Sequence, residues 1–253
     1  MISNNNKIKI LSAVSICFIV AVFCIKRFAQ NSHYHLFSDN IEIFAIPNFN
    51  NVISNFPFIV FGIIGITFII KKHKKNQKST ILLASLFFFL GIFFTGIGSS
   101  YYHLYPNTNT LVWDRLPMVI VFMSFFSSII TENISNSLGK KSLVYLLIIG
   151  VISVLYWYIT ELFGIGDLRL YVIVQFLPLI LIPLILLMFN NLSSSNKYYW
   201  FIIGIYILAK IFETFDEQIY LITNVISGHT IKHLVASIAP FIYYRKLSYL
   251  NKN

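Results

Sequence analysis

Three of the six histidines lie within apolar runs, where an ionisable side chain is costly and usually serves a function. They are His103, His229 and His233, and the last two are four residues apart, so on a helix both imidazoles face the same side. Two imidazoles at this spacing can bind one metal ion. Three neutral imidazoles are typical of catalytic zinc, which keeps a fourth position open to water. We therefore predict a zinc (Zn²⁺) site at these residues.

Two more polar residues accompany the histidines. Ser99 precedes His103 by four residues, and Asp114 begins the next apolar run. Asp114 could accept the proton of a water molecule or orient an imidazole, and Ser99 could donate to a developing oxyanion. The alternative for Asp114 is a helix cap, because carboxylates favour helix N-termini.

The histidines have two other interpretations. They could form hydrogen bonds between helices, which would add only about 0.6 kcal/mol each. Two of them could also ligate a haem iron, but the third histidine and Asp114 would then have no role. A metal site uses all of these residues.

The composition indicates which elements position these side chains. The 253-residue chain is 57% hydrophobic and 17% aromatic but only 11% charged, whereas soluble domains carry about a quarter charged residues. Its apolar residues gather in runs of roughly twenty, the length that crosses a bilayer as a helix. Within these runs, apolar and polar residues do not alternate as they do in the strands of a membrane barrel. We predict an all-α fold, a polytopic transmembrane helix bundle.

Eight apolar segments are expected, with no internal repeat and no long linker. They are residues 8–25, 52–70, 81–102, 110–130, 143–162, 170–189, 198–215 and 222–244. The first could instead be a signal peptide, because it is short and is followed by a weakly cleavage-like sequence at Phe28–Gln30. We expect an uncleaved helix.

The formal net charge of +10 indicates the orientation of the chain in the membrane rather than binding of nucleic acid. No basic surface with interleaved aromatic residues is present, which argues against nucleic acid, and the charge suits contact with anionic lipid headgroups. Most basic residues fall on one side of the expected spans, which the positive-inside rule makes cytoplasmic. These residues are Lys71–Lys78, Lys140, Lys141, Lys197, Arg245, Lys246 and Lys252, with Lys26 and Arg27 as exceptions. This orientation puts the three histidines and Asp114 in the outer half of the membrane.

The remaining polar residues have simpler interpretations. We expect His33, His35 and His73 to be solvated. Lys210, Glu213 and Glu217 have helical spacing and should neutralise one another, while Asp216 should face the headgroups and Lys232 should point away from the histidines. Cys17 and Cys24 support neither a disulfide framework nor a metal site.

The run Gly98–His103 is followed after ten residues by Asp114–Met118 and far downstream by Gly228–Leu234. These motifs resemble the alkaline ceramidase family, within the wider group of seven-helix membrane hydrolases that includes adiponectin-receptor-like proteins. The resemblance begins near Asp39, and Gly166–Arg169 is similar to bacterial members. It implies that the three histidines bind zinc and that Ser99 and Asp114 assist hydrolysis of the ceramide amide.

The resemblance also implies an organisation of the chain. Residues 1–26 would be an additional N-terminal transmembrane or signal-anchor helix, residues 27–50 an extracytoplasmic segment, and residues 51–253 a seven-helix ceramidase-like membrane domain. Such a chain would lie in the bacterial inner (cytoplasmic) membrane. Nothing in the sequence indicates an oligomeric state.

The family has a calcium site in its outer segment. Asp39 and Glu42 keep the spacing of its first two carboxylates, but Phe44 replaces a further ligand and Asn48 replaces a later acidic residue. Two carboxylates and one amide would bind calcium (Ca²⁺) weakly, because oxygen count and charge set its affinity. The alternative is a solvated loop with helix-capping residues.

The resulting hypothesis is a zinc-dependent intramembrane hydrolase that cleaves the amide of ceramide or a related N-acyl lipid into a fatty acid and an amine. Asp114 would act as the base, and an ester substrate stays possible. The rivals are a non-enzymatic lipid receptor or scaffold that holds zinc structurally, and an ion or proton carrier that uses Lys210 and the acidic cluster.

Overall fold

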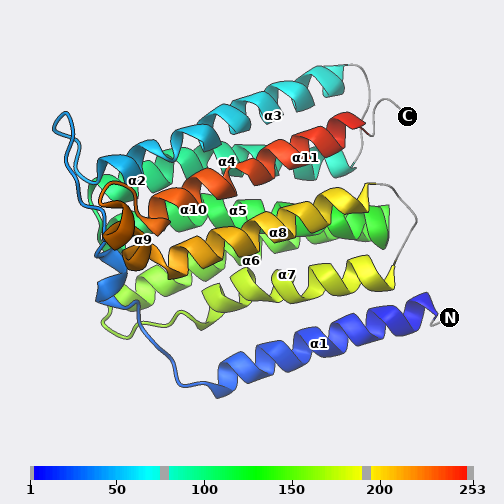
Figure 1. Cartoon of the computed structure of the whole chain (residues 1–253). Helices are drawn as coiled ribbons and strands as arrows, with labels where there is room; N and C mark the ends of the chain where they lie inside the picture. Colours follow the sequence, from blue (N-terminus) through cyan, green and yellow to red (C-terminus); the bar gives the residue numbers. More distant parts are fainter. Residues whose placement is uncertain (1–2, 75–79, 190–194, 250–253) are drawn as a thin grey trace. The chain divides into compact units, whose positions relative to one another are not determined.

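The computed structural model describes residues 3–74, 80–189 and 195–249, and most of them are helical. In chain order the helices are α1 (Asn4–Cys24), the short 3₁₀ helix η1 (Ser32–His35), α2 (Phe49–Ile53), α3 (Phe56–Lys74), α4 (Thr80–Leu104), α5 (Thr108–Asn133), α6 (Asn136–Leu162), α7 (Arg169–Met188), α8 (Asn196–Thr214), α9 (Asp216–Thr223), α10 (Gly228–Ala236) and α11 (Ile238–Tyr249) (Figure 1). Within these ranges the only β-pairing is an isolated bridge between Ile43 and Ile46. The predicted all-α fold is confirmed.

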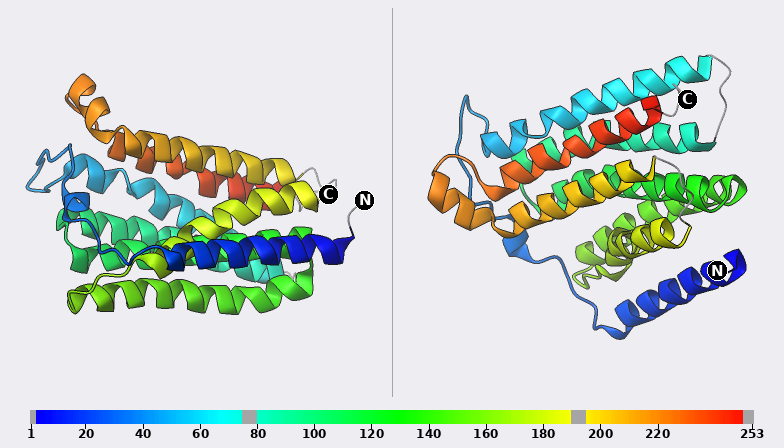
Figure 2. Two further views of the ribbon diagram at one scale, coloured as in Figure 1. Left: turned by 90° about the horizontal axis from the view of Figure 1, so that it is seen from below. Right: turned by 45° about the vertical axis from the view of Figure 1, so that its right-hand side comes forward.

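Six of the helical stretches are long and apolar enough to cross a membrane. They are α1, the stretch Phe49–His73 formed by α2 and α3, α4, α5, α6 and α7. Helices α8 and α9 pass the same test together, but the chain bends by 69° between them (Figure 2). The chain is therefore a multi-pass integral membrane protein, as predicted.

The expectation of a single helix over residues 222–244 is wrong. Asn224 ends α9 in the left-handed conformation, with φ of 56°, and Ser227 then caps α10 by accepting a hydrogen bond from the Thr230 amide at 3.2 Å. A second break follows at Ser237. Pro240 accounts for it, because proline has no N–H to donate to the carbonyl four residues earlier.

The described chain forms two compact units, and each is considered by itself. Unit 1 contains Met1–Asn31, Asn76–Phe88 and Val119–Ser193, and unit 2 contains Ser32–Lys75, Phe89–Met118 and Ser194–Asn253. All residues of the predicted zinc site belong to unit 2. Helices α4 and α5 contribute residues to both units.

In unit 1, α7 packs against both α1 and α6. The loop before α7 is held by Asp167, whose carboxylate accepts bonds from the Arg169 guanidinium at 2.7 Å and the Tyr156 hydroxyl at 3.0 Å. The hydrogen bond from Arg169 is the main reason why the pKa of Asp167 lies below its usual range. The family-like run Gly166–Arg169 thus forms the turn that leads the chain into α7.

In unit 2, glycines let α3 and α4 pack closely, as small residues commonly do in membrane helix pairs. A Cβ on Gly62 would lie 2.7 Å from Phe93, and one on Gly65 would lie 2.0 Å from the Phe89 ring. Helix α11 contacts both α3 and α8. Lys246 of α11 is fully buried, with its Nζ 4.5 Å from the Tyr199 ring centroid.

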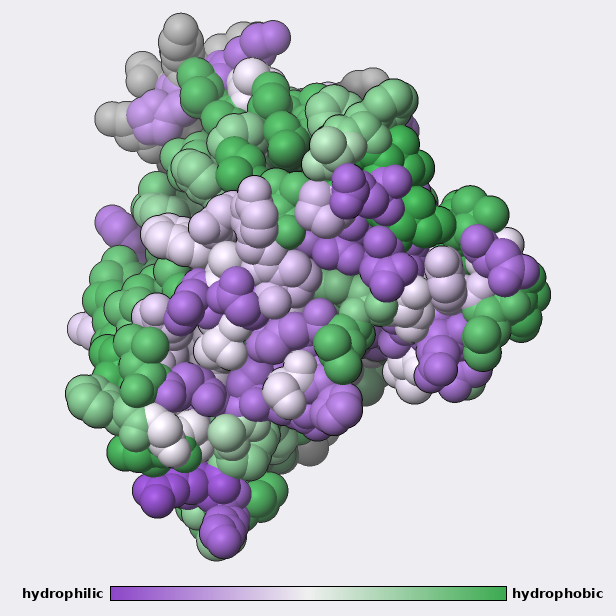
Figure 3. All heavy atoms as spheres, turned by 90° about the vertical axis from the view of Figure 1, so that its left-hand side faces the viewer, coloured by the Kyte–Doolittle hydropathy of each residue, from purple (hydrophilic) through white to green (hydrophobic). Residues whose placement is uncertain are grey.

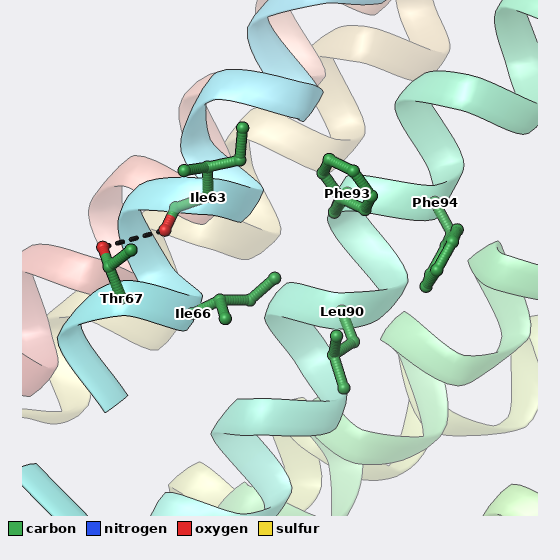
Figure 4. Close-up of a pocket in the computed structure, with 6 residues that line it drawn as sticks. All are labelled: Ile63, Ile66, Thr67, Leu90, Phe93 and Phe94. Carbon is green, nitrogen blue, oxygen red and sulfur yellow. Dashed lines mark hydrogen bonds between the residues drawn. The ribbon is translucent and has the colours of Figure 1, made fainter. Parts of the chain in front are cut away.

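An apolar groove of about 200 Å³ lies between α3 and α4. Ile63, Ile66 and Thr67 line it from α3, and Leu90, Phe93 and Phe94 line it from α4 (Figure 4). The Thr67 hydroxyl is satisfied within its own helix by the Ile63 carbonyl at 2.9 Å. The groove therefore offers hydrocarbon contact without hydrogen bonds, as a lipid-facing surface does.

Figure 3 shows hydrophilic and hydrophobic residues on one face of the molecule. The expected basic loop extends beyond Lys74, and its residues Lys75 and Lys78, like Lys252 in the tail, lie outside the described residues. The predicted sidedness therefore stays a prediction.

Candidate metal centre

The three histidines of the predicted zinc site meet in unit 2. His103 comes from the end of α4, and His229 and His233 come from α10. All three are buried, and their candidate ligand atoms lie within 4.8 Å of one another. The Nε2 atoms of His103 and His229 are 3.3 Å apart. The cluster predicted from the sequence is therefore present and could hold a metal ion.

The geometry suits a small tetrahedral ion. Two nitrogens that each lie about 2.0–2.1 Å from one tetrahedral zinc are about 3.3–3.4 Å apart. The separation of 3.3 Å between His103 Nε2 and His229 Nε2 matches this value. Three imidazoles without a thiolate are also the donor set of catalytic rather than structural zinc sites.

Ser54 fixes the orientation of His233. Its Oγ lies 2.8 Å from His233 Nδ1, and it donates its own proton to the Asn51 carbonyl at 3.1 Å. The serine must then accept from His233, so Nδ1 carries the proton and Nε2 keeps its lone pair for a ligand. No spacing in the sequence predicts this contact, because Ser54 lies 179 residues before His233.

Replacing Ser54 with alanine should weaken metal binding by about 10- to 100-fold, the usual cost of losing the group that orients a ligand histidine. The dissociation constant for zinc, measured by competition with a chelator, tests this. Ser85→Ala is the matched control, because Ser85 is fully buried but donates within α4 to the Ile81 carbonyl at 2.6 Å. Equal zinc affinity in Ser54→Ala and Ser85→Ala would contradict the role of Ser54.

Asp114 is buried in α5. It is not a helix cap, because α5 begins at Thr108 and Asn107 accepts from the amides of Asn109 and Thr110 at 2.9 and 3.1 Å. Its carboxylate is hydrogen-bonded to the Ser99 side chain and lies within electrostatic range of Lys232. The structure thus joins the predicted pair Ser99 and Asp114.

Gly98 makes this pairing possible. A Cβ at position 98 would lie 1.9 Å from the Trp113 carbonyl oxygen, so α4 and α5 can approach only with glycine there. Ser99 and Asp114 are the next residues along each helix.

Replacing Gly98 with alanine should therefore destabilise the protein by about 1–3 kcal/mol or more, as overpacking does. Thermal unfolding in detergent measures this loss. Gly204→Ala is the control, since a Cβ there would meet nothing within 4 Å and helical alanine is favoured over glycine by about 1 kcal/mol. A Gly98→Ala protein as stable as Gly204→Ala would contradict the tight contact.

Asp216 positions α10. Its Oδ1 accepts from the His229 amide at 2.6 Å, and its Oδ2 accepts from the Ser38 amide at 3.5 Å. Gly228 allows this approach, because a Cβ would lie 2.1 Å from the Phe212 carbonyl oxygen. The expectation that Asp216 faces the headgroups is therefore replaced by a role in anchoring the start of the histidine helix.

Lys232 faces the cluster, contrary to expectation. Its Nζ is 3.0 Å from His229 Nε2 and 3.1 Å from Glu213 Oε1. Residues three apart are neighbours on a helix, so Lys232 shares a face with His229. Glu213 also pairs with Lys210, as predicted, whereas Glu217 is exposed on α9. The third member of this charge cluster is therefore Lys232 and not Glu217.

The segment before α2 covers the histidines. The Phe37 ring lies 4.6 Å from the His103 ring and 4.9 Å from the His229 ring, measured between centroids. His35 is not solvated as expected, because its Nδ1 is 2.9 Å from the Tyr102 hydroxyl. Burial and the charge of Arg115 lower the pKa of His35. The sequence carries no signal for this cover beyond an aromatic-rich run.

The predicted calcium residues are used in other contacts. Asp39 is fully buried, and its two carboxylate oxygens accept from the Ile41 amide at 3.2 Å and the Asn50 side chain at 2.9 Å. Asn48 donates to the His103 carbonyl at 2.8 Å, and Glu42 is exposed. These contacts connect the segment of residues 39–50 to the end of α4, and the calcium site stays a prediction.

Comparison with known proteins identifies a family for the chain. A family model described as Ceramidase matches residues 42–253, which is more than half of the chain and includes all the proposed zinc-site residues. No curated protein matches the chain. The match begins at residue 42, so Tyr34, His35 and Phe37, which precede it, lie outside the part of the chain that the family model matches.

Proposed function

Because the chain belongs to the ceramidase family, we propose that it is a zinc-dependent intramembrane hydrolase that cleaves the amide of ceramide or a related N-acyl lipid. The family itself supports ceramide hydrolysis in general. The observation that carries the finer proposal is the buried cluster of His103, His229 and His233. Asp114 is hydrogen-bonded to Ser99, one helical turn before His103.

His103, His229 and His233 would hold the zinc ion. When bound, zinc supplies a Lewis acid that polarises a carbonyl and lowers the pKa of a water molecule to about 7. Ser54 keeps the His233 imidazole in the tautomer that such binding needs.

Asp114 is the proposed general base. It takes a proton from the attacking water as the new C–O bond forms, and it returns that proton to the amide nitrogen as the C–N bond breaks. One water is consumed, and the products are a fatty acid and an amine. The hydrogen bond from Ser99 orients the carboxylate, while its sequence-based role at the oxyanion stays a proposal.

The surroundings fit a lipid substrate. His103 and Asp114 lie on α4 and α5, which are long enough to span a bilayer, and the apolar groove between α3 and α4 offers a surface for hydrocarbon. We propose that the site lies in the outer half of a bacterial cytoplasmic membrane. We also propose that the chain is divided into an N-terminal helix up to residue 26, an extracytoplasmic segment up to residue 50 and the membrane domain. A calcium ion at Asp39, Glu42 and Asn48 is part of the same proposal.

Release of fatty acid by the purified chain in detergent tests this function. Long-chain ceramide, a simple N-acyl amine and an ester with the same acyl chain should be compared. Faster release from the amides than from the ester supports the proposal. A folded chain that binds zinc but releases fatty acid from none of these lipids would contradict it and favour a lipid receptor.

A further inference from the structure

Lys232 brings a positive charge against the histidine cluster. Its Nζ lies 3.0 Å from His229 Nε2, and that nitrogen lies 3.3 Å from His103 Nε2. An ammonium has three donors and no acceptor, so Lys232 can meet this nitrogen only by donating to its lone pair. The proposed zinc ion needs the same lone pair. The ammonium and the ion therefore compete for His229.

Glu213 on α8 holds the ammonium in this position. Its Oε1 accepts from Lys232 Nζ at 3.1 Å, and its Oε2 pairs with Lys210. The side chain of Lys232 is 18% exposed, whereas that of Lys210 is 42% exposed. Asp216 does not share this role, because its carboxylate accepts from backbone amides, among them that of His229. One carboxylate thus anchors Lys232, which is directed toward the histidines.

Lys232 also lies close to the place where the reaction is proposed to occur. In its present position, Nζ is no more than about 5 Å from any zinc ion bonded to His229 Nε2, since such bonds are about 2.0–2.1 Å long. The bond to His229 would then be lost, and Glu213 would accept from one of the three N–H groups. The largely buried ammonium would need another acceptor, because an unsatisfied buried donor is costly.

Amide hydrolysis creates such an acceptor. As the water oxygen bonds to the carbonyl carbon, an electron pair of the C=O double bond moves to the carbonyl oxygen, which becomes negative. This pair returns to the C=O bond when the C–N bond breaks. A fixed donor at this oxygen stabilises the transition state, and it does so more strongly in a site with little water than in bulk water.

We propose that Lys232 is a further catalytic residue, which donates a hydrogen bond to the amide oxygen while that oxygen is negative. The inference rests on the proposed function and deepens it. The substrate remains a neutral N-acyl lipid, because the charge forms only during the reaction. The lysine keeps its proton throughout, so the balance of the hydrolysis is unchanged. Lys232 then has two opposing effects, since it weakens zinc binding and speeds turnover.

Replacing Lys232 with methionine, which has a similar length and no charge, separates these effects. Zinc should bind about 10- to 100-fold more tightly, because the competing charge-assisted hydrogen bond to His229 is lost. With zinc saturating, kcat should fall by about 10²- to 10³-fold, the usual cost of removing one donor to the oxyanion. KM should stay within about threefold, because this bond forms only in the transition state. Chelator competition and steady-state kinetics in detergent measure these changes.

Lys210→Met is the matched control. Lys210 also pairs with Glu213, but its ammonium is not in contact with the histidines. This variant should keep its zinc affinity and its kcat within about threefold of the wild type. Thermal unfolding shows whether both variants are folded. The same changes in Lys210→Met as in Lys232→Met would overturn the inference, because the effect would then come from the Glu213 ion pairs.

Binding of a tetrahedral anion provides a readout without turnover. A long-chain alkylphosphonate carries negative oxygens on a tetrahedral centre, as the transition state does, and such analogues bind more tightly than substrates. The zinc-loaded wild type should bind it about tenfold or more tightly than zinc-loaded Lys232→Met. Equal binding by the two proteins would overturn the role of Lys232.

The kinetic outcomes distinguish this inference from the proposed function. A lysine that only supports the fold would make zinc affinity and kcat fall together in Lys232→Met, and that result would overturn the inference. A wild-type kcat in this variant would overturn it as well, while leaving the hydrolase proposal intact. If the wild type released no fatty acid from any N-acyl lipid, the proposed function would fail and the catalytic role of Lys232 with it.

Discussion

Replacing His233 with alanine should remove zinc from the purified protein and lower fatty-acid release by more than about 100-fold. Loss of a residue that merely orients a ligand costs about 10- to 100-fold, so loss of the ligand itself should cost more. His233 contributes one of three imidazoles whose ligand atoms lie within 4.8 Å of one another. Metal content and initial rate, measured on the same preparation, check this result.

His33→Ala is the matched control for this variant. His33 is exposed in η1, and it is not part of the buried cluster. It should keep both zinc and activity. A His233→Ala protein that is folded and retains one zinc per chain would contradict the proposed ligand set.

Asp114→Asn should lower kcat by about 10²- to 10⁴-fold while zinc stays bound, because it removes a general base without removing an imidazole. The amide has the shape of the carboxylate and can still accept a bond from Ser99, so the local packing should persist. Steady-state kinetics with the best substrate, together with metal analysis, measures both parts of this prediction.

Ser99→Ala separates the base from its hydrogen-bond partner. It should reduce kcat less than Asp114→Asn, because the carboxylate remains and only its orientation is loosened. If Asp114→Asn lost zinc along with activity, Asp114 would be a metal ligand rather than a base. If it kept wild-type activity, the mechanism would be wrong.

The metal centre could be predicted because its signals are local or compositional. His229 and His233 share a helical face by spacing alone, and the lysine-rich loops suggested a common depth for His103 and Asp114. The structure confirms that the three imidazoles meet. Ionisable residues in apolar runs are so unusual that their positions carry information without a structure.

The spans were predictable from apolar length, but the breaks between α9, α10 and α11 were not. A left-handed residue at Asn224, a serine cap at Ser227 and a proline after Ser237 divide what reads as one apolar run. Each signal is a single residue within hydrophobic sequence. Their combined effect is to place His229 near the start of a short helix.

The contacts around the metal centre depend on tertiary structure. Lys232 was expected to point away, yet Glu213 on α8 attracts it toward His229. Phe37 covers two imidazoles from a segment with no hydrophobic periodicity. Ser54 meets His233 across 179 residues of sequence. Spacing rules describe one helix at a time and cannot show such pairings.

Zinc content measured together with fatty-acid release is the most direct test of the central claim that the three histidines hold a catalytic metal. The wild-type protein should contain about one zinc per chain. A chelator should remove the metal and the activity together, and added zinc should restore both. A folded, metal-free protein that hydrolyses an N-acyl lipid at the full rate would contradict the claim.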